Sequence, residues 1–190
     1  MRPRTRWSKG WLVIPFLTLI LSACGTSEQR PMETVPQVDL DRFMGDWYVI
    51  ASIPTFVEKG AHNAVESYAL NPDGTVATTF SFRKDGFDGP EKVYHPKGFV
   101  IPGTGNARWG MQFIWPFKGD FRIIWLEPDY SVTVIGREKR DYVWIMARSP
   151  QIPDEKYEEI VAYLAQTGYD VGKLQRVPQR WPAQGGSATR

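Results

Sequence analysis

The side chains best suited to chemistry are few in this chain and scattered along it. There is one cysteine, Cys24, and two histidines, His62 and His95. A lone thiol can form no intrachain disulfide and no Cys-x-x-Cys redox or metal pair. Neither histidine has a second ligand-type residue at metal spacing, and neither His-Glu-x-x-His nor Gly-x-Ser-x-Gly occurs. The sequence therefore predicts no metal site, no cofactor and no catalytic residues.

Cys24 is interpreted through its surroundings. Residues 1–10 are basic, and the apolar run over 11–21 is too short for a bilayer, which needs about 20 residues. This order is typical of a secretory signal. The run ends Leu-Ser-Ala-Cys at 21–24, which resembles the lipobox of bacterial lipoproteins, where the cysteine is acylated. The alternative is an ordinary signal peptide followed by an incidental cysteine.

The lipobox resemblance implies that residues 1–23 are a signal peptide and that Cys24 carries the attached lipid. Gly25, not Asp, follows the cysteine, which under enterobacterial-type sorting implies the outer membrane. We expect the protein there, lipid-anchored and facing the periplasm. Several acyl chains on one residue anchor stably, whereas a single chain binds marginally. Residues 24–37 are polar and contain proline, and are expected to form a flexible tether.

Composition indicates one globular domain and argues against nucleic-acid binding. The 190 residues are 42% hydrophobic and 14% aromatic, enough for a real core. Four of the 23 basic residues lie in residues 1–23, which hold no acid. The remainder therefore carries 19 basic against 21 acidic residues. A nucleic-acid-binding domain carries a basic stripe, which this balance does not support.

Hydrophobic periodicity predicts a β protein with one helix. Residues 107–115 alternate clearly, with Ala, Trp, Met, Phe and Trp on one side. An apolar stripe at helical spacing over 153–166 indicates a helix packed by one face. Eight strand candidates with short turns suggest an antiparallel sandwich or barrel, and the pattern alone leaves both open. They fall near residues 45–53, 62–70, 75–84, 91–101, 107–115, 120–127, 131–138 and 142–150.

Three motifs carry a resemblance to a known family. Residues 39–50 follow Asp-Leu-x-Arg-Phe-x-Gly-x-Trp-Tyr-x-Ile, which resembles the first signature of the lipocalins, most closely the bacterial outer-membrane lipocalins of the Blc type. The second signature, typically Thr-Asp-Tyr, stands here as Pro-Asp-Tyr at 128–130. The strand near 142–150 is similar to the segment that ends in the third signature's arginine, here Arg148.

The resemblance implies an all-β fold, an eight-stranded antiparallel up-and-down barrel with a C-terminal α-helix near 153–167. The domain would span residues 38–177, with 178–190 as a disordered tail. The resemblance also implies that Arg148 stacks on Trp47 at the closed end, as a structural pair and not a catalytic or anion site. The implied structural signature comprises Gly45, Trp47, Asp129, Tyr130 and Arg148.

A closed eight-stranded barrel can hold one small ligand, and inward aromatic side chains would line its cavity. In lipocalins the first strand-to-strand loop folds over the mouth, so Phe56 and Val57 would cap the cavity; a plain surface loop is the alternative. From alternation and this resemblance, the candidate lining residues are Phe56, Phe80, Phe82, Trp109, Met111, Phe113 and Trp125.

The resemblance implies a binding protein, not an enzyme, that takes a fatty acid or lysophospholipid for lipid transport or storage in the envelope. Burying methylene groups contributes about 0.8 kcal/mol each, so an acyl chain suffices for binding. Alternatives are a lipocalin-fold enzyme acting on a lipid or isoprenoid, and a carrier of haem or another pigment. The expected partners are this ligand and the membrane, through acylated Cys24. The oligomeric state stays open, a homodimer being one option.

Overall fold

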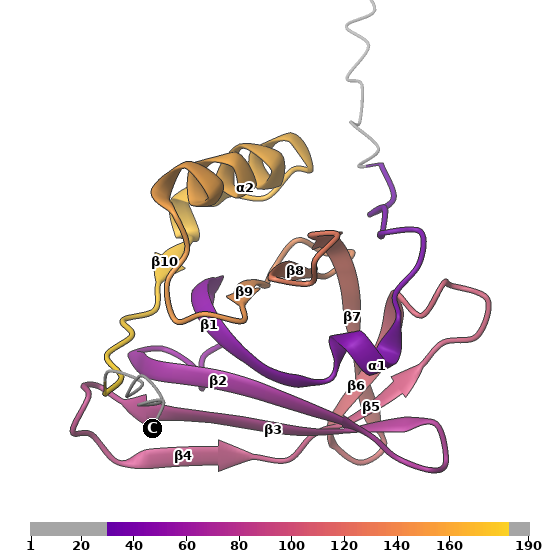
Figure 1. Cartoon of the computed structure of the whole chain (residues 1–190), viewed down its shortest axis with the longest axis horizontal. Coiled ribbons are helices and arrows are strands. Elements are labelled where there is room, and N and C mark those ends of the chain that lie inside the picture. Colours follow the sequence, from indigo (N-terminus) through magenta and orange to yellow (C-terminus); the bar gives the residue numbers. More distant parts are fainter. Residues whose placement is uncertain (1–29, 183–190) are drawn as a thin grey trace, which may run out of the picture.

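The computed structural model describes residues 30–182 of the 190-residue chain. They form one antiparallel sheet that curls round until β1 pairs with β9 and closes a barrel (Figure 1). The expected signal segment 1–23 and Cys24 lie outside the described residues, as does the end of the expected tail, 183–190. The barrel predicted from the motifs is thus confirmed over the described chain.

The barrel has eight strand positions. Strands β4 and β5 pair with successive parts of β3 and share one position. Pro96 stands between them, and its missing N–H interrupts the ladder there. The short β10 pairs with Ala51 and Ser52 of β1, beyond the part of β1 that pairs with β2. The bounds are β1 Gly45–Ile53, β2 Ala61–Leu70, β3 Thr75–Lys84, β4 Glu91–Tyr94, β5 Lys97–Val100, β6 Arg108–Ile114, β7 Phe117–Leu126, β8 Val132–Gly136, β9 Val143–Ala147 and β10 Gln175–Arg176.

Neighbouring strands run in opposite directions, so their connections alternate between the two ends of the barrel. We call the end at which β1 finishes the mouth and the end at which β1 begins the base. The mouth comprises loops 54–60, 85–90, 115–116 and 137–142. The base comprises turns 71–74, 101–107 and 127–131 and the short helix α1 (Leu40–Phe43).

The base is closed by α1 and by buried aromatic side chains. Trp47 is fully buried, and its indole N–H donates to the carbonyl oxygen of Phe43 at 2.9 Å. The Arg148 guanidinium carbon lies 3.8 Å from the centroid of the Trp47 ring. Gly45 turns the chain from α1 into β1 with φ +92°, and a Cβ there would lie 3.4 Å from Arg148 Nη1. Arg148 also donates to the carbonyl oxygens of Arg42, Phe43, Met44 and Asp46.

The turn that carries the second motif is tied to α1. The Tyr130 hydroxyl accepts a hydrogen bond from the Asp39 N–H at 2.8 Å, and the Arg42 guanidinium carbon lies 4.0 Å from the Tyr130 ring centroid. Asp129 accepts from the N–H of Ser131 at 2.9 Å, which holds the turn. The Asp-Tyr pair thus links α1 to the turn between β7 and β8 although the usual threonine is absent.

The helix α2 (Asp154–Gln166) packs against the outside of the barrel (Figure 1). Ile160 and Leu164 of the predicted stripe are fully buried there, among outward side chains of β1, β7, β8 and β9. The helix is followed by Gly168 with φ +93°, a conformation that suits its C-terminal cap. The predicted helix is confirmed. In the described part of the chain, no helix has the length and apolarity needed to cross a membrane.

The segment before α1 lies on the barrel and is not a free tether. Met32 is buried, and the Val35 N–H donates to the Ile123 carbonyl oxygen of β7 at 3.0 Å. The flexible tether predicted for 24–37 is therefore wrong from residue 30 onward. The prediction relied on the polar composition of the segment and gave no weight to its few apolar side chains, such as Met32, that hold it against the barrel.

The chain after β10 is also held, as far as residue 182. The Gln179 side-chain amide donates to the carbonyl oxygens of Val49 and Ala64, at 2.8 and 3.1 Å. The Arg180 N–H donates to Asn63 Oδ1 at 2.7 Å. The predicted disordered tail, 178–190, is therefore wrong for its first five residues, because their polar groups pair with carbonyls and side chains of β1 and β2.

Candidate functional site

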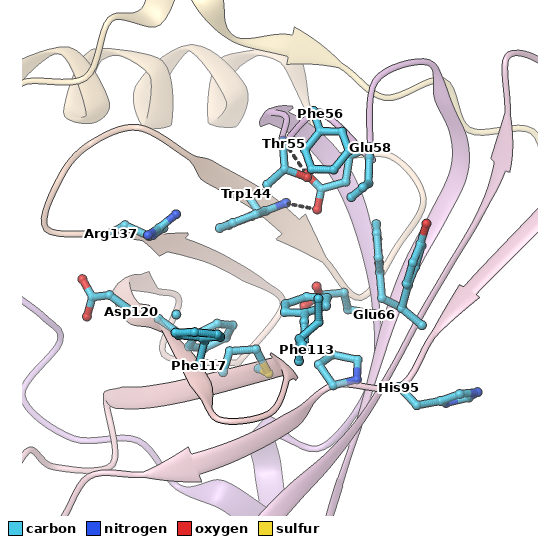
Figure 2. A pocket seen from close by; sticks show the side chains of 18 residues that line it. Thr55, Phe56, Glu58, Glu66, His95, Phe113, Phe117, Asp120, Arg137 and Trp144 are labelled. Carbon is cyan, nitrogen blue, oxygen red and sulfur yellow. Dashed lines mark hydrogen bonds between the residues drawn. The ribbon is translucent and has the colours of Figure 1, made fainter.

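The mouth half of the barrel contains a cavity of about 530 Å³, which we call the calyx. This volume is typical of small-molecule sites, which span roughly 300–1,000 Å³. Phe113 and Phe117 line the calyx and are also exposed, so it reaches solvent at the mouth (Figure 2). The lining residues are Thr55, Phe56, Val57, Glu58, Glu66, Phe80, Tyr94, His95, Pro96, Met111, Phe113, Ile114, Phe117, Gly119, Asp120, Phe121, Arg137 and Trp144.

Four of the seven predicted lining residues meet in the calyx: Phe56, Phe80, Met111 and Phe113. Val57 also lines it, so the loop between β1 and β2 does fold over the mouth. The other three predicted residues, which are Phe82, Trp109 and Trp125, do not line the calyx.

Trp125 was assigned to the wrong face of its strand. The pairing of β7 with β8 shifts register between Ile123 and Trp125, so strict alternation fails there. Ile123 packs in the barrel interior, whereas Trp125 packs on α2, with its ring 5.0 Å from that of Tyr163. An irregularity of one residue therefore sends the indole outward.

Trp109 and Phe82 do point inward, but they belong to packed core. The Trp109 ring stacks on Phe121 at 4.8 Å and meets Phe43 edge-on at 5.6 Å, in the aromatic layer of the base. Phe82 packs against the rings of Phe80 and Tyr94. Alternation gives the face of a strand but not the height along the barrel axis. For Trp109 this height places the ring in the base, whereas Phe82 lies nearer the mouth than Phe80 and packs against the Phe80 and Tyr94 rings instead.

A buried carboxyl group in the calyx wall was missed from the sequence. Glu66 lies on the inward face of β2 between buried Ala64 and Tyr68, and is 8% exposed. The Tyr68 hydroxyl donates to Glu66 Oε2. Burial raises the pKa of Glu66 to about 7, and the nearby charge of Glu58 adds to this, while the Tyr68 hydrogen bond opposes it. The alternation of residues along β2, which puts Glu66 on the same face as Ala64 and Tyr68, was the sequence signal that could have predicted its burial.

A second carboxyl group belongs to the mouth loop between β1 and β2. Glu58 is buried beneath the β1–β2 loop, where its carboxylate accepts from the Thr55 N–H at 2.8 Å and the Trp144 indole N–H at 3.2 Å (Figure 2). Burial raises the pKa of Glu58, although these hydrogen bonds lower it in part. The two acids make the inner calyx unfavourable for a ligand's carboxylate.

One permanently charged cation, Arg137, is found among the lining residues. It forms an ion pair with Asp141 at 3.4 Å, and its Nε is buried without a hydrogen-bond partner in the described structure. His95 is exposed and hydrogen-bonds Thr79 at 3.3 Å, and Figure 2 shows its ring directed away from the other lining side chains. Positive charge at the calyx is therefore concentrated at Arg137.

The arrangement suits binding of an apolar molecule. Among residues 30–182 no group of three or more histidine, aspartate or glutamate side chains could hold a metal ion. The lining contains no serine, cysteine or lysine that could act as a nucleophile. Most of the wall is aromatic or aliphatic, and its charged side chains are Glu58, Glu66, Asp120 and Arg137.

Comparison with known proteins agrees with the barrel and the calyx. A model of the lipocalin-like domain matches residues 38–179. Temperature-induced lipocalin-1 of Arabidopsis thaliana is 34% identical, over 80% of this chain and 86% of the relative. The outer membrane lipoprotein Blc of Escherichia coli (strain K12) is 28% identical, over 85% of this chain and 90% of the relative.

Solved structures extend the likeness at the level of the fold. Insecticyanin from the tobacco hornworm Manduca sexta superposes with a TM-score of 0.63, covering 81% of this chain and 86% of that one, at 14% identity. Apolipoprotein D of Bos taurus is a further curated relative, 28% identical over 72% of this chain and 74% of its own length. With a matching domain model, a closed eight-stranded barrel and an apolar calyx, the chain belongs to the lipocalin family.

Proposed function

We propose that the calyx holds one single-chain lipid, with the acyl chain inside and the polar head at the mouth. The apolar wall supports the placement of the chain, since each buried methylene contributes about 0.8 kcal/mol. A lysophospholipid fits better than a free fatty acid. Its phosphate would pair with Arg137 at the edge, whereas a carboxylate drawn deeper would meet Glu66.

We further propose that the protein acts in lipid transport or storage at the bacterial outer membrane, anchored through acylated Cys24 and facing the periplasm. The lipobox-like run at 21–24 and the similarity to the outer membrane lipoprotein Blc support this placement. No catalytic step is part of the proposal, which rests on the apolar wall of the calyx.

Titration of the anchor-free chain, begun at Gly25, tests the ligand. This chain keeps every residue that the structure describes. Lysophosphatidylethanolamines and fatty acids of eight to eighteen carbons are compared below their micelle concentrations by calorimetry at pH 6 and pH 8. Affinity should rise with chain length in both series, and only the fatty acids should weaken at pH 8, where Glu66 is charged.

Arg137→Gln should weaken lysophospholipid binding by roughly tenfold and leave the dependence on chain length unchanged. Arg83→Gln is the matched control, because Arg83 pairs with Glu91 outside the calyx. Equal affinity across all chain lengths would refute an apolar calyx. Equal affinity of the wild type and Arg137→Gln for lysophospholipid would refute the placement of the phosphate.

A further inference from the structure

Five large apolar side chains form a rim around the mouth, which we call the mouth rim. Each is more than half exposed, Trp115 by 82% and Phe117 by 76%. Every other exposed large apolar side chain among the described residues is less than half exposed, at most 47%. The mouth rim consists of Phe56, Phe113, Ile114, Trp115 and Phe117.

Four rim residues share one hairpin. Phe113 and Ile114 end β6, Trp115 follows, and Phe117 begins β7. Their backbone turns at the tip of the hairpin, so the side chains project from the barrel at its mouth end. Phe56, from the β1–β2 loop, completes the rim. A soluble surface rarely leaves so many large side chains together in water, and such groups mark a contact site.

The rim is continuous with the calyx. Phe56, Phe113, Ile114 and Phe117 line the cavity and are also exposed. Trp115 is exposed but is not among the lining residues. An apolar path therefore runs from the outside of the mouth into the cavity. A lipid leaving a bilayer along this path would keep its acyl chain out of water.

The described chain begins at the same end of the barrel. The Arg30 carbonyl oxygen accepts from Arg140 Nη2 at 2.6 Å, and the Met32 N–H donates to the Glu138 carboxylate at 3.2 Å. Arg140 and Glu138 lie in the mouth loop 137–142. From there the segment passes β7 and reaches the base, where the Val38 N–H donates to the Gly105 carbonyl oxygen.

This course limits how far the domain can stand from an anchor at Cys24. Residues 24–29 can span about 20 Å when extended, at roughly 3.3–3.6 Å per residue. They start from the mouth end, not from the base. An anchored chain would therefore keep the mouth, and not the closed end, next to the bilayer.

We propose that the mouth rim inserts into the surface of a lipid bilayer, so that the calyx opens directly onto the membrane. This inference rests on the proposed function for its purpose, the exchange of a lipid. Tryptophan and phenylalanine suit the boundary between headgroups and acyl chains. The mouth loops carry acids, such as Asp85 and Asp88, as well as Lys59, so the contact depends on apolar insertion more than on charge.

Vesicle flotation of the anchor-free chain tests the insertion without help from Cys24. The vesicles are phosphatidylethanolamine with phosphatidylglycerol at 3:1, at low and high salt. The wild type should float with them at both salt concentrations. Trp115→Asp should reduce the partition coefficient at least tenfold, and Trp115→Phe should restore most of it. Leu70→Asp, at an exposed apolar position of the base end, is the matched control and should float like the wild type.

Two further measurements separate the outcomes. Brominated lipids should quench a larger share of the tryptophan emission in the wild type than in Trp115→Phe. Lysophospholipid titration in solution, without vesicles, should give the same affinity for Trp115→Asp as for the wild type. If neither protein bound lysophospholipid while the wild type floated and Trp115→Asp did not, the proposed function would be refuted and the insertion would stand.

The insertion is refuted if the wild type stays at the bottom of the gradient, or if Trp115→Asp floats as well as the wild type. It is also refuted if sedimentation shows a dimer that Trp115→Asp dissociates, with no flotation of either protein. That last result would assign the rim to contact with a second copy of this chain.

Discussion

The base and the mouth of the barrel are lined by the inward faces of the same strands, but the base is closely packed and the mouth encloses a cavity. At the base, Trp47 and Trp109 are fully buried, and both pack against the ring of Phe43. At the mouth, the inward side chains stand apart around a cavity of about 530 Å³, and three carboxyl groups, those of Glu58, Glu66 and Asp120, line it. Protein interiors are normally close-packed, so an open cavity of this size forgoes stabilising contacts.

The difference indicates that stability comes from the base and binding from the mouth. The base holds Arg148, which joins α1 to Trp47 through hydrogen bonds and ring stacking. The mouth holds groups that are costly to keep, namely buried Glu66 and exposed Trp115. Substitutions in the packed base should therefore lower stability more than ligand binding, and substitutions of calyx residues at the mouth should lower binding more than stability.

The largest effect on stability is expected from Trp47→Ala. Removing a fully buried indole should lower the free energy of unfolding by about 3–5 kcal/mol, through lost burial and the void that remains. Equilibrium urea unfolding measures the change. If this variant unfolded with the wild-type midpoint and slope, the base would not be the stabilising half.

Glu66→Gln should change how stability depends on pH. The folded pKa of Glu66, about 7, lies above its ordinary value of 4.5, so the folded state holds this proton more tightly than the unfolded chain. The corresponding stability is present below pH 4.5 and is lost as pH rises through about 7. Between pH 5 and pH 8 the wild type should lose about 2–3 kcal/mol that the Gln variant keeps. Parallel pH profiles for the two proteins would contradict the buried acid.

Arg148→Ala should cost about 2 kcal/mol. It removes the ring contact with Trp47 and leaves the last carbonyl oxygens of α1 without a donor. Arg148→Lys keeps the charge but not the planar guanidinium, so its stability should lie between those of the wild type and Arg148→Ala. Urea unfolding gives the stability, and ligand titration should show unchanged affinity. A variant of normal stability that no longer bound lipid would assign Arg148 to the calyx instead.

Phe113→Ala should have the smallest effect on stability and a clear effect on binding. The side chain is 56% exposed, so unfolding should change by no more than about 0.5 kcal/mol. It also lines the calyx, and its loss should weaken acyl-chain binding by roughly tenfold. Calorimetry and urea unfolding on the same preparation check both. A strongly destabilised variant would place Phe113 in the core.

The sequence was most informative at the base and least informative at the mouth. Motifs around Trp47 and Tyr130 describe local, tightly determined contacts, so they predicted the barrel well. Alternation placed Phe80 and Met111 correctly in the calyx wall. It failed at Trp125, because a register shift in β7 turns the side chain outward.

Other features could not be predicted because they depend on distances between elements. Trp109 faces inward as predicted, but its height along the axis places it in the base. Glutamate is usually exposed, and the burial of Glu66 follows from closure of the sheet around it. The exposure of Trp115 depends on where the hairpin tip ends relative to the other mouth loops.

The way in which the barrel closes has a consequence for the order of events during folding. β1, at the start of the domain, completes its pairing only with β9 and β10. Tyr48 pairs with Ala147, and Ala51 pairs with Arg176, so both contacts need the end of the domain. Contacts between residues so distant in sequence form slowly. On the ribosome β1 would emerge long before its partners, with a free edge open to wrong pairing. Shielding of that edge until synthesis nears its end would then govern the yield of folded protein.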